Sequence, residues 1–275
     1  AESRLFRWIA VLTGSKNALK GAGFFLGAAL LELTGFRGAL ALLADGLLLV
    51  LILTAVLLPR RLGKLKSKPK FSQVFSKSPA INWLSAARFF LFGSRDVWFV
   101  VALPVFLYSV LGWSFSRVGG FLALWIIGYG LVQASAPRLL RRSHRGVGPD
   151  GGTAQLWAFL LAAFPAAMAL ALGQGLEPAP VLVTGLVAFG VVFAINSAVH
   201  SYLVVAWSDR DKVSMNVGFY YMANAGGRLT GTVLSGWVYQ TQGLTGCLWW
   251  SAGFVIMTAV LSTRLPRGAS DEVRE

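Results

Sequence analysis

Three charged residues lie close together inside an apolar stretch, residues 86–107 (AARFFLFGSRDVWFVVALPVFL): Arg88, Arg95 and Asp96. A charge at the centre of a membrane helix costs roughly 2.5 to 3.5 kcal/mol, so such residues usually face the protein interior or a water-filled path. Two helical turns bring Arg88 and Arg95 to nearly one face, with Asp96 about 100° round from Arg95. The stretch predicts a membrane helix with one polar face. Alternatively, Arg88 reaches a lipid headgroup and Arg95 only pairs with Asp96.

Two lysines in the first apolar stretch add to this basic set. Lys16 and Lys20 are one helical turn apart on one face, followed by Gly23 and Gly27. This small-residue spacing is typical of helices that approach each other closely. We therefore expect both lysines to bind an anionic substrate beside a tight helix contact. The alternative is that their long stems reach lipid phosphates at the membrane surface.

A polar stripe marks another apolar stretch near the end of the chain. Asn216, Tyr220, Asn224 and Arg228 recur every four residues, with Tyr221 alongside. Arginine suits bidentate binding of phosphate-like or carboxylate oxygens, and Asn and Tyr supply neutral hydrogen bonds that fix orientation. We predict that Tyr221, Asn224 and Arg228 bind substrate. The alternative is that the stripe holds helices together around a satisfied arginine.

Asn196 and His200, again one turn apart, are further candidates for the same site. The pair could bind substrate or relay protons, since histidine titrates near neutral pH, or it could simply be hydrogen-bonded within the bundle. Asp96 is expected to orient Arg95 or to couple protons. The chain has one cysteine, Cys247, so it cannot build a multi-thiolate metal site, and we expect no metal and no cofactor.

The composition places this polar set in a membrane protein. The chain has 275 residues, of which 56% are hydrophobic and 13% charged, with a mean hydropathy of +0.65. These values predict an all-α, polytopic membrane helical bundle. The net charge of +14 could suggest a nucleic-acid partner, but the basic residues lie between apolar runs, so lipid topology explains them better.

Apolar runs long enough to cross about 30 Å of hydrocarbon number eight. They are residues 8–33, 38–58, 81–111, 118–136, 153–172, 181–207, 213–239 and 244–262. Between them, Lys and Arg collect on one side of the membrane, and only Arg37 and Arg117 fall on the other. Because short cytoplasmic loops collect basic residues, both chain ends are predicted to be cytoplasmic, in a multi-pass protein of the plasma (inner) membrane.

The chain divides into four parts. Residues 1–58 are predicted to hold the last two helices of an N-terminal half, 59–80 a basic cytoplasmic linker near anionic lipid, 81–263 a C-terminal six-helix half and 264–275 a cytoplasmic tail. A weak internal repeat with an offset of 208 supports this division. It aligns Lys16 with Asn224 and Lys20-Gly-Ala-Gly23 with Arg228-Leu-Thr-Gly231.

Four runs resemble one transporter family. They are residues 5–28 (LFRWIAVLTGSKNALKGAGFFLGA), 86–107, 119–139 (GGFLALWIIGYGLVQASAPRL) and 208–236 (SDRDKVSMNVGFYYMANAGGRLTGTVLSG). They look like the organoarsenical efflux permeases of the major facilitator superfamily (ArsJ). The resemblance implies a partial major facilitator fold lacking about the first four of twelve helices. It also implies an antiporter that confers arsenate resistance by exporting 1-arseno-3-phosphoglycerate, made when a glyceraldehyde-3-phosphate dehydrogenase uses arsenate.

Two other functions stay open at this stage. One is a facilitator-type carrier for another organic anion, such as a sugar phosphate or a drug. The other is a membrane-embedded enzyme or a scaffold without transport activity. We expect no enzyme, because the sequence has no HExxH zinc motif, no P-loop and no nucleophile elbow.

Overall fold

The structure, a computed structural model, describes residues 2–58, 78–141, 148–208 and 213–267. Helices and the turns between them make up these ranges, and no strand occurs in them, so the predicted all-α fold is confirmed. The helices are α1 (Glu2–Leu57), α2 (Pro79–Phe99), α3 (Ala102–Ser109), α4 (Phe115–Arg141), α5 (Gly151–Gly173), α6 (Pro178–Ala206) and α7 (Val213–Ser262). The basic linker and the C-terminal tail lie mostly outside the described residues.

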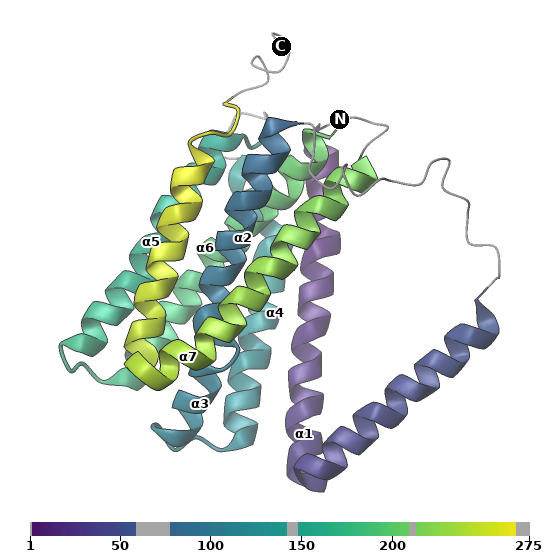
Figure 1. The fold of residues 1–275 in the computed structure, drawn as a ribbon, viewed down its shortest axis with the longest axis vertical. Helices are drawn as coiled ribbons and strands as arrows, with labels where there is room; N and C mark the ends of the chain where they lie inside the picture. The colour runs from purple at the N-terminus through teal and green to yellow at the C-terminus, as the bar shows by residue number, and fades with distance from the viewer. Residues whose placement is uncertain (1, 59–77, 142–147, 209–212, 268–275) are drawn as a thin grey trace.

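Two of these helices each consist of two segments joined at a glycine. α1 turns back at Gly35 (φ 67°) and α7 at Gly243 (φ 67°), as Figure 1 shows. Glycine occupies such positions because it has no Cβ to clash at positive φ. Six helical stretches in the described ranges are long and apolar enough to cross a membrane, and the two longest have 52 and 48 residues. When the two segments of α1 and of α7 are counted separately, helical segments lie at all eight of the predicted spans.

The two kinks agree with the internal repeat. Gly35 and Gly243 are separated by the same 208 residues as Lys20 and Arg228. Each kink is followed three residues later by another glycine, Gly38 or Gly246. The first segment of α1 therefore corresponds to the first segment of α7, which places Lys20 and Arg228 at equivalent levels of two matching helices.

The third predicted span is broken. We expected one helix over residues 81–111, but α2 ends at Phe99 and α3 begins at Ala102. Pro104 explains the break, because it has no N–H to donate and its ring clashes with the carbonyl four residues earlier. The hydroxyl of Ser235 on α7 accepts the freed backbone N–H groups of Val101 (3.3 Å) and Ala102 (3.1 Å). The break is thus stabilised by the helix that faces it.

α2 packs most extensively against α7, and glycines make this possible. A Cβ at Gly231 would lie 2.7 Å from the Gly93 carbonyl oxygen and 3.1 Å from the Asp96 Cβ, and one at Gly227 would overlap the Phe89 carbonyl. The two backbones are therefore in direct contact on either side of Arg228. This contact fixes the position of Arg228 relative to Asp96.

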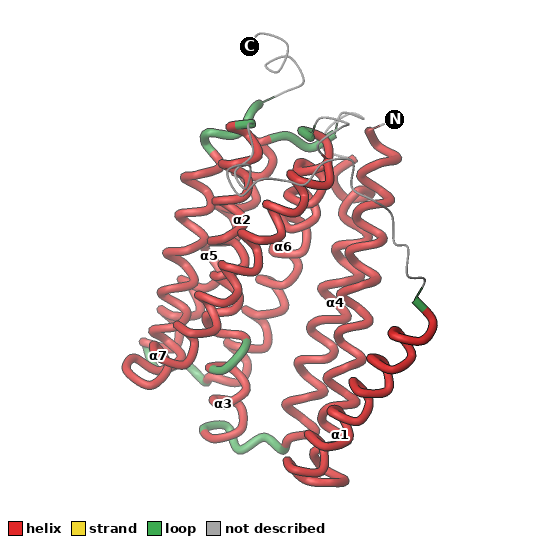
Figure 2. Tube along the Cα trace, turned by 45° about the vertical axis from the view of Figure 1, so that its right-hand side comes forward, coloured by secondary structure: helices red, strands yellow, loops and turns green. Residues whose placement is uncertain are grey.

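The first segment of α1 packs along α4, side by side in Figure 2. The close approach uses Gly14 and Gly21 on α1 and Gly130 on α4. The prediction that Gly23 and Gly27 make a tight helix contact is wrong, because a Cβ at either position would meet nothing within 4 Å. These two glycines instead border an open groove between α1, α3 and the start of α4, since spacing alone does not tell which face a helix presents to its neighbour.

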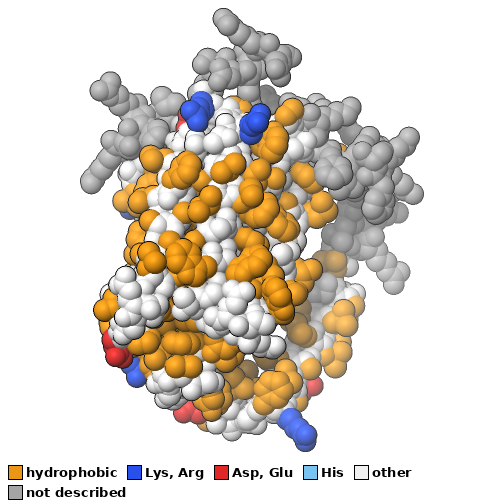
Figure 3. All heavy atoms as spheres, turned by 60° about the vertical axis from the view of Figure 1, so that its left-hand side comes forward, with side chains coloured by type: hydrophobic (Ala, Val, Ile, Leu, Met, Phe, Trp, Pro, Cys, Tyr) orange, Lys and Arg blue, Asp and Glu red, His pale blue; other side chains and the backbone are white. Residues whose placement is uncertain are grey.

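The surface is apolar across the middle of the bundle. In Figure 3, hydrophobic side chains cover the middle of one face, and charged side chains lie toward its ends. The second segment of α1 leans away from the bundle, and its residues 40–58 are all exposed. Arg37 lies beside the Gly35 kink and Arg117 in the first turn of α4, both at the end of the bundle away from the start of α1. This separation of basic residues agrees with the predicted topology.

Candidate functional site

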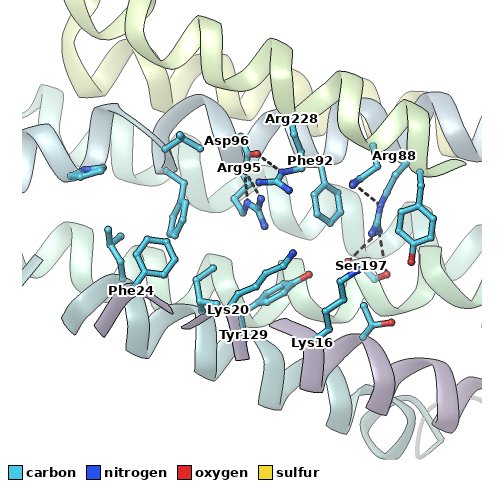
Figure 4. Close-up of a pocket in the computed structure, with 18 residues that line it drawn as sticks. Lys16, Lys20, Phe24, Arg88, Phe92, Arg95, Asp96, Tyr129, Ser197 and Arg228 are labelled. Atoms are coloured by element: carbon cyan, nitrogen blue, oxygen red, sulfur yellow. Dashed lines mark hydrogen bonds and ion pairs between the residues drawn. The ribbon is translucent and has the colours of Figure 1, made fainter. Parts of the chain in front are cut away.

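A cavity of about 300 Å³ lies between α1 and α4 on one side and α2 and α7 on the other. Figure 4 shows Lys16 and Lys20 extending from α1 toward the arginines of α2 and α7. The polar side chains of the lining come from five helices: Thr13, Lys16 and Lys20 from α1, Arg88, Arg95 and Asp96 from α2, Tyr129 from α4, Ser197 from α6, and Tyr221, Asn224 and Arg228 from α7. Residues far apart in the sequence thus share one space.

Arg88 is buried and held by neutral groups. Its Nε donates to the Asn224 side-chain oxygen (3.3 Å), and its Nη1 donates to the Ser197 hydroxyl (3.1 Å) and carbonyl (3.3 Å). Its guanidinium carbon lies 3.9 Å from the centre of the Phe92 ring, a cation–π contact. At 3% exposure, Arg88 does not reach a lipid headgroup, so that alternative is wrong. No carboxylate pairs with Arg88 in the described ranges, and its charge remains uncompensated.

Arg95 and Arg228 share a single carboxylate. Asp96 Oδ1 accepts from the Arg95 Nε (2.6 Å), and Oδ2 accepts from the Arg228 Nε (2.8 Å). Asp96 is fully buried, and a buried charge of this kind is stable only when it is paired and hydrogen-bonded. Asp96 was expected to orient Arg95, and it does bind Arg95, but the same carboxylate also binds Arg228 from the other helix.

The cavity carries an excess of positive charge. Lys16, Lys20 and the three arginines face the single carboxylate of Asp96, a formal excess of four positive charges. Both oxygens of that carboxylate are already engaged by arginines. Fixed cations in a space with low-dielectric walls concentrate anions. The arrangement is therefore suited to an anionic ligand with several oxygen acceptors.

Eight of the ten predicted site residues line this cavity. The exceptions are Asn196 and His200, which lie on α6 and are fully buried. The side-chain polar atoms of both residues have no hydrogen-bond partner in the described part of the chain. The spacing of Asn196 and His200 correctly indicated one helix. On that helix, however, Ser197 lines the cavity and Asn196 does not. A role in proton relay remains a prediction for this pair.

Sequence reasoning missed several residues of the cavity lining, among them Ser197, Tyr129 and Phe92. Ser197 is bonded to Arg88 and also accepts from the Gln133 side chain (3.3 Å), Tyr129 lines the cavity from α4, and Phe92 lies between Arg88 and Arg95. A small hydroxyl and two aromatics are common in membrane helices, so their types carried no signal. The only available signal was that Phe92 lies one turn after Arg88 and so shares its face.

Replacing Asn224 tests the position of Arg88. In Asn224→Ala, Arg88 loses the acceptor that holds its Nε, and a hydrogen bond to a charged group contributes about 1.5 to 3 kcal/mol. We expect anion affinity to fall roughly tenfold or more, measured by binding of 3-phosphoglycerate to the purified protein. Thr232→Ala on the same helix is the control, because in the described part of the chain its hydroxyl donates only to the Arg228 carbonyl within its own helix. Equal affinity of the two variants would contradict the assignment.

Comparison with known proteins supports the fold. No protein-family model matches the chain, and no curated protein sequence matches it. Among solved structures, it is similar to a bacterial homologue of the iron transporter ferroportin, crystallised in an outward-facing state, with a TM-score of 0.67 and 16% sequence identity. The chain has a membrane transporter fold. The match covers 96% of this chain but only 64% of the ferroportin homologue, so the chain spans about two thirds of its length.

Proposed function

We propose that the protein is a secondary membrane transporter that carries an organic anion through the cavity between α1, α2, α4 and α7. The observation that carries this proposal is the charge of the cavity, where five basic side chains face one carboxylate. Arginine binds phosphate-like oxygens through several donors at once, and Asn224 and Tyr221 add neutral hydrogen-bonding groups. The transporter fold supports the same function.

A metal cation suits this cavity less well than an anion, although the structurally similar protein is named for iron transport. In the described residues, no group of three or more His, Cys, Asp and Glu side chains is positioned to hold a metal ion. The one carboxylate in the cavity is bonded to two arginines, which compete with any cation. The excess of fixed positive charge repels cations as well.

We further propose that the anion is 1-arseno-3-phosphoglycerate and that its export confers arsenate resistance. The support is the resemblance of residues 5–28, 86–107, 119–139 and 208–236 to the organoarsenical efflux permeases. The lining agrees with this chemistry, because pentavalent arsenate and phosphate esters need basic donors, whereas trivalent arsenic needs several thiolates. A carrier for another organic anion, such as a sugar phosphate, is the alternative.

The orientation of the chain is part of the proposal. We infer that the start of α1 and the end of α7 face the cytoplasm of the cell that makes the ester, since the order of the predicted spans assigns most loop Lys and Arg residues to that side. The linker between α1 and α2 would lie there against anionic lipid. The functional partner is a glyceraldehyde-3-phosphate dehydrogenase, which supplies the substrate on the same side of the membrane.

The test is arsenate resistance in bacteria that lack arsenic efflux of their own. The full-length gene is expressed with and without the dehydrogenase, and growth and cell-associated arsenic are measured in arsenate. We expect resistance and lower cellular arsenic only when both proteins are present, because the transporter needs the ester and not free arsenate.

Two results would count against the substrate. Resistance without the dehydrogenase would indicate that free arsenate is carried. No resistance in either strain, together with sugar-phosphate uptake into vesicles containing the protein, would favour the alternative carrier. Resistance to arsenite is not expected under any of these conditions.

A further inference from the structure

Asp96 binds two arginines that differ in their freedom to move. Arg95 precedes Asp96 on α2, and its side chain is 9% exposed, whereas Arg228 reaches Asp96 from α7 with a side chain 46% exposed. The Arg95 guanidinium also lies 5.1 Å from the Phe92 ring and 5.8 Å from the Phe99 ring, which enclose it. Asp96 and Arg95 therefore form a fixed pair, and Arg228 is the partner that can leave.

Arg228 has donors to spare for a ligand. A guanidinium carries five N–H groups, and in the described residues Arg228 donates only from Nε, to the Asp96 Oδ2. Its side chain is half-exposed and belongs to the lining of the cavity. An oxyanion that approaches it offers a second acceptor to the same guanidinium that Asp96 holds. Carboxylate and ligand are thus placed to compete for one cation.

We propose that Asp96 is a resident anion that competes with the transported anion for Arg228, so that ligand entry replaces the Asp96–Arg228 bond while Arg95 keeps Asp96 in place. This rests on the proposed function, that the cavity carries an anion. Among the residues that the structure describes, Arg88 has no carboxylate partner, and it holds the ligand throughout. When the ligand leaves, Asp96 takes Arg228 back, which favours release and prevents the basic cavity from becoming a trap.

The proposed exchange at Arg228 takes place where the backbones of α2 and α7 are in direct contact. Gly227 and Gly231 bring the backbones together on either side of Arg228, and a Cβ at Gly231 would lie 3.1 Å from the Asp96 Cβ. The Asp96–Arg228 bond is therefore one of the links between these helices. Its replacement by a ligand connects occupancy of the cavity to the packing of α2 against α7.

The test compares anion binding and transport in the wild type and Asp96→Asn. Binding of 3-phosphoglycerate, a stable phosphate-bearing anion, is measured on purified protein in lipid nanodiscs, and its exchange is measured in proteoliposomes. Asparagine keeps the shape of aspartate but not its charge, so it holds Arg228 much more weakly than the carboxylate does. We expect about tenfold tighter binding together with slower exchange, a fall in both KM and kcat. A purely structural Asp96 would weaken binding or leave it unchanged.

A second variant separates the loss of the Asp96–Arg228 bond from the change in the cavity's total charge. Arg95→Gln/Asp96→Asn removes one cation and one anion, so the cavity keeps its formal charge while Arg228 loses its charged partner. Binding tighter than in the wild type is expected here too. Asp45→Asn is the matched control, because it removes an aspartate from the exposed second segment of α1, and its affinity should equal that of the wild type.

Each remaining outcome decides between the two proposals. If neither the wild type nor any variant binds 3-phosphoglycerate, inorganic phosphate or arsenate, the proposed anion transport is wrong and this inference is wrong with it. If the wild type binds but both neutral variants bind equally or more weakly, only the inference is wrong. If neither variant reaches the membrane folded while the control does, Asp96 is a structural counter-ion and the inference is again wrong.

Discussion

Arg228→Gln should abolish arsenate resistance in the full-length protein while its level in the membrane stays unchanged. Arg228 is half-exposed to the cavity and provides the donors that we assign to the substrate. Removing one member of a hydrogen-bonded charge pair typically costs about 2 to 5 kcal/mol, which corresponds to a loss of roughly 30-fold or more in affinity. The measurements are growth in arsenate in the presence of the dehydrogenase and immunodetection of the protein in membranes.

Arg37→Gln is the matched control for this substitution. Arg37 is exposed, lies next to the Gly35 kink and is remote from the cavity lining, so its loss should leave resistance within about twofold of the wild type. Lys68→Gln in the linker should also change little, although Lys68 lies outside the described residues. Full resistance in Arg228→Gln would contradict the site while leaving the transporter fold intact.

Gly227→Ala should destabilise the protein strongly. A methyl group at this position overlaps the Phe89 carbonyl, a backbone atom that cannot turn aside as a side chain can. Overpacking of this kind costs about 1 to 3 kcal/mol, and more when backbones must separate. We expect the thermal midpoint in detergent to fall by roughly 2 to 4 °C for each kcal/mol. Anion binding should weaken as well, because Arg228 moves with α7.

Gly236→Ala on the same helix is the matched control, because it makes the same glycine-to-alanine substitution at a position with open space. A Cβ there meets nothing within 4 Å, so only the better helix propensity of alanine remains, and stability should be unchanged or slightly higher. If both alanine variants melt at the wild-type temperature, the close contact of α2 and α7 does not limit stability. Loss of stability at both positions would point to a general intolerance of alanine in α7.

The sequence by itself determined the class of the protein and most of the polar set. Apolar runs of membrane-spanning length predicted the helices, because hydrocarbon leaves a backbone no alternative to satisfying its own hydrogen bonds. Charges inside those runs identified Arg88, Arg95, Asp96 and Arg228, since a buried charge is too costly to be incidental. The turn-to-turn spacing of Lys16 and Lys20 likewise predicted a shared face.

Only the tertiary structure decided how these residues meet. Helical periodicity tells which residues share a face but not which helix that face contacts, so the sequence wrongly assigned the tight contact to Gly23 and Gly27 and not to Gly14 and Gly21. For the same reason Ser197 was missed beside Asn196. The sharing of Asp96 between Arg95 and Arg228 joins residues 132 positions apart, and it depends on the backbone contact that the glycines of α7 allow. Partners across helices are set by packing in three dimensions, which one-dimensional spacing does not contain.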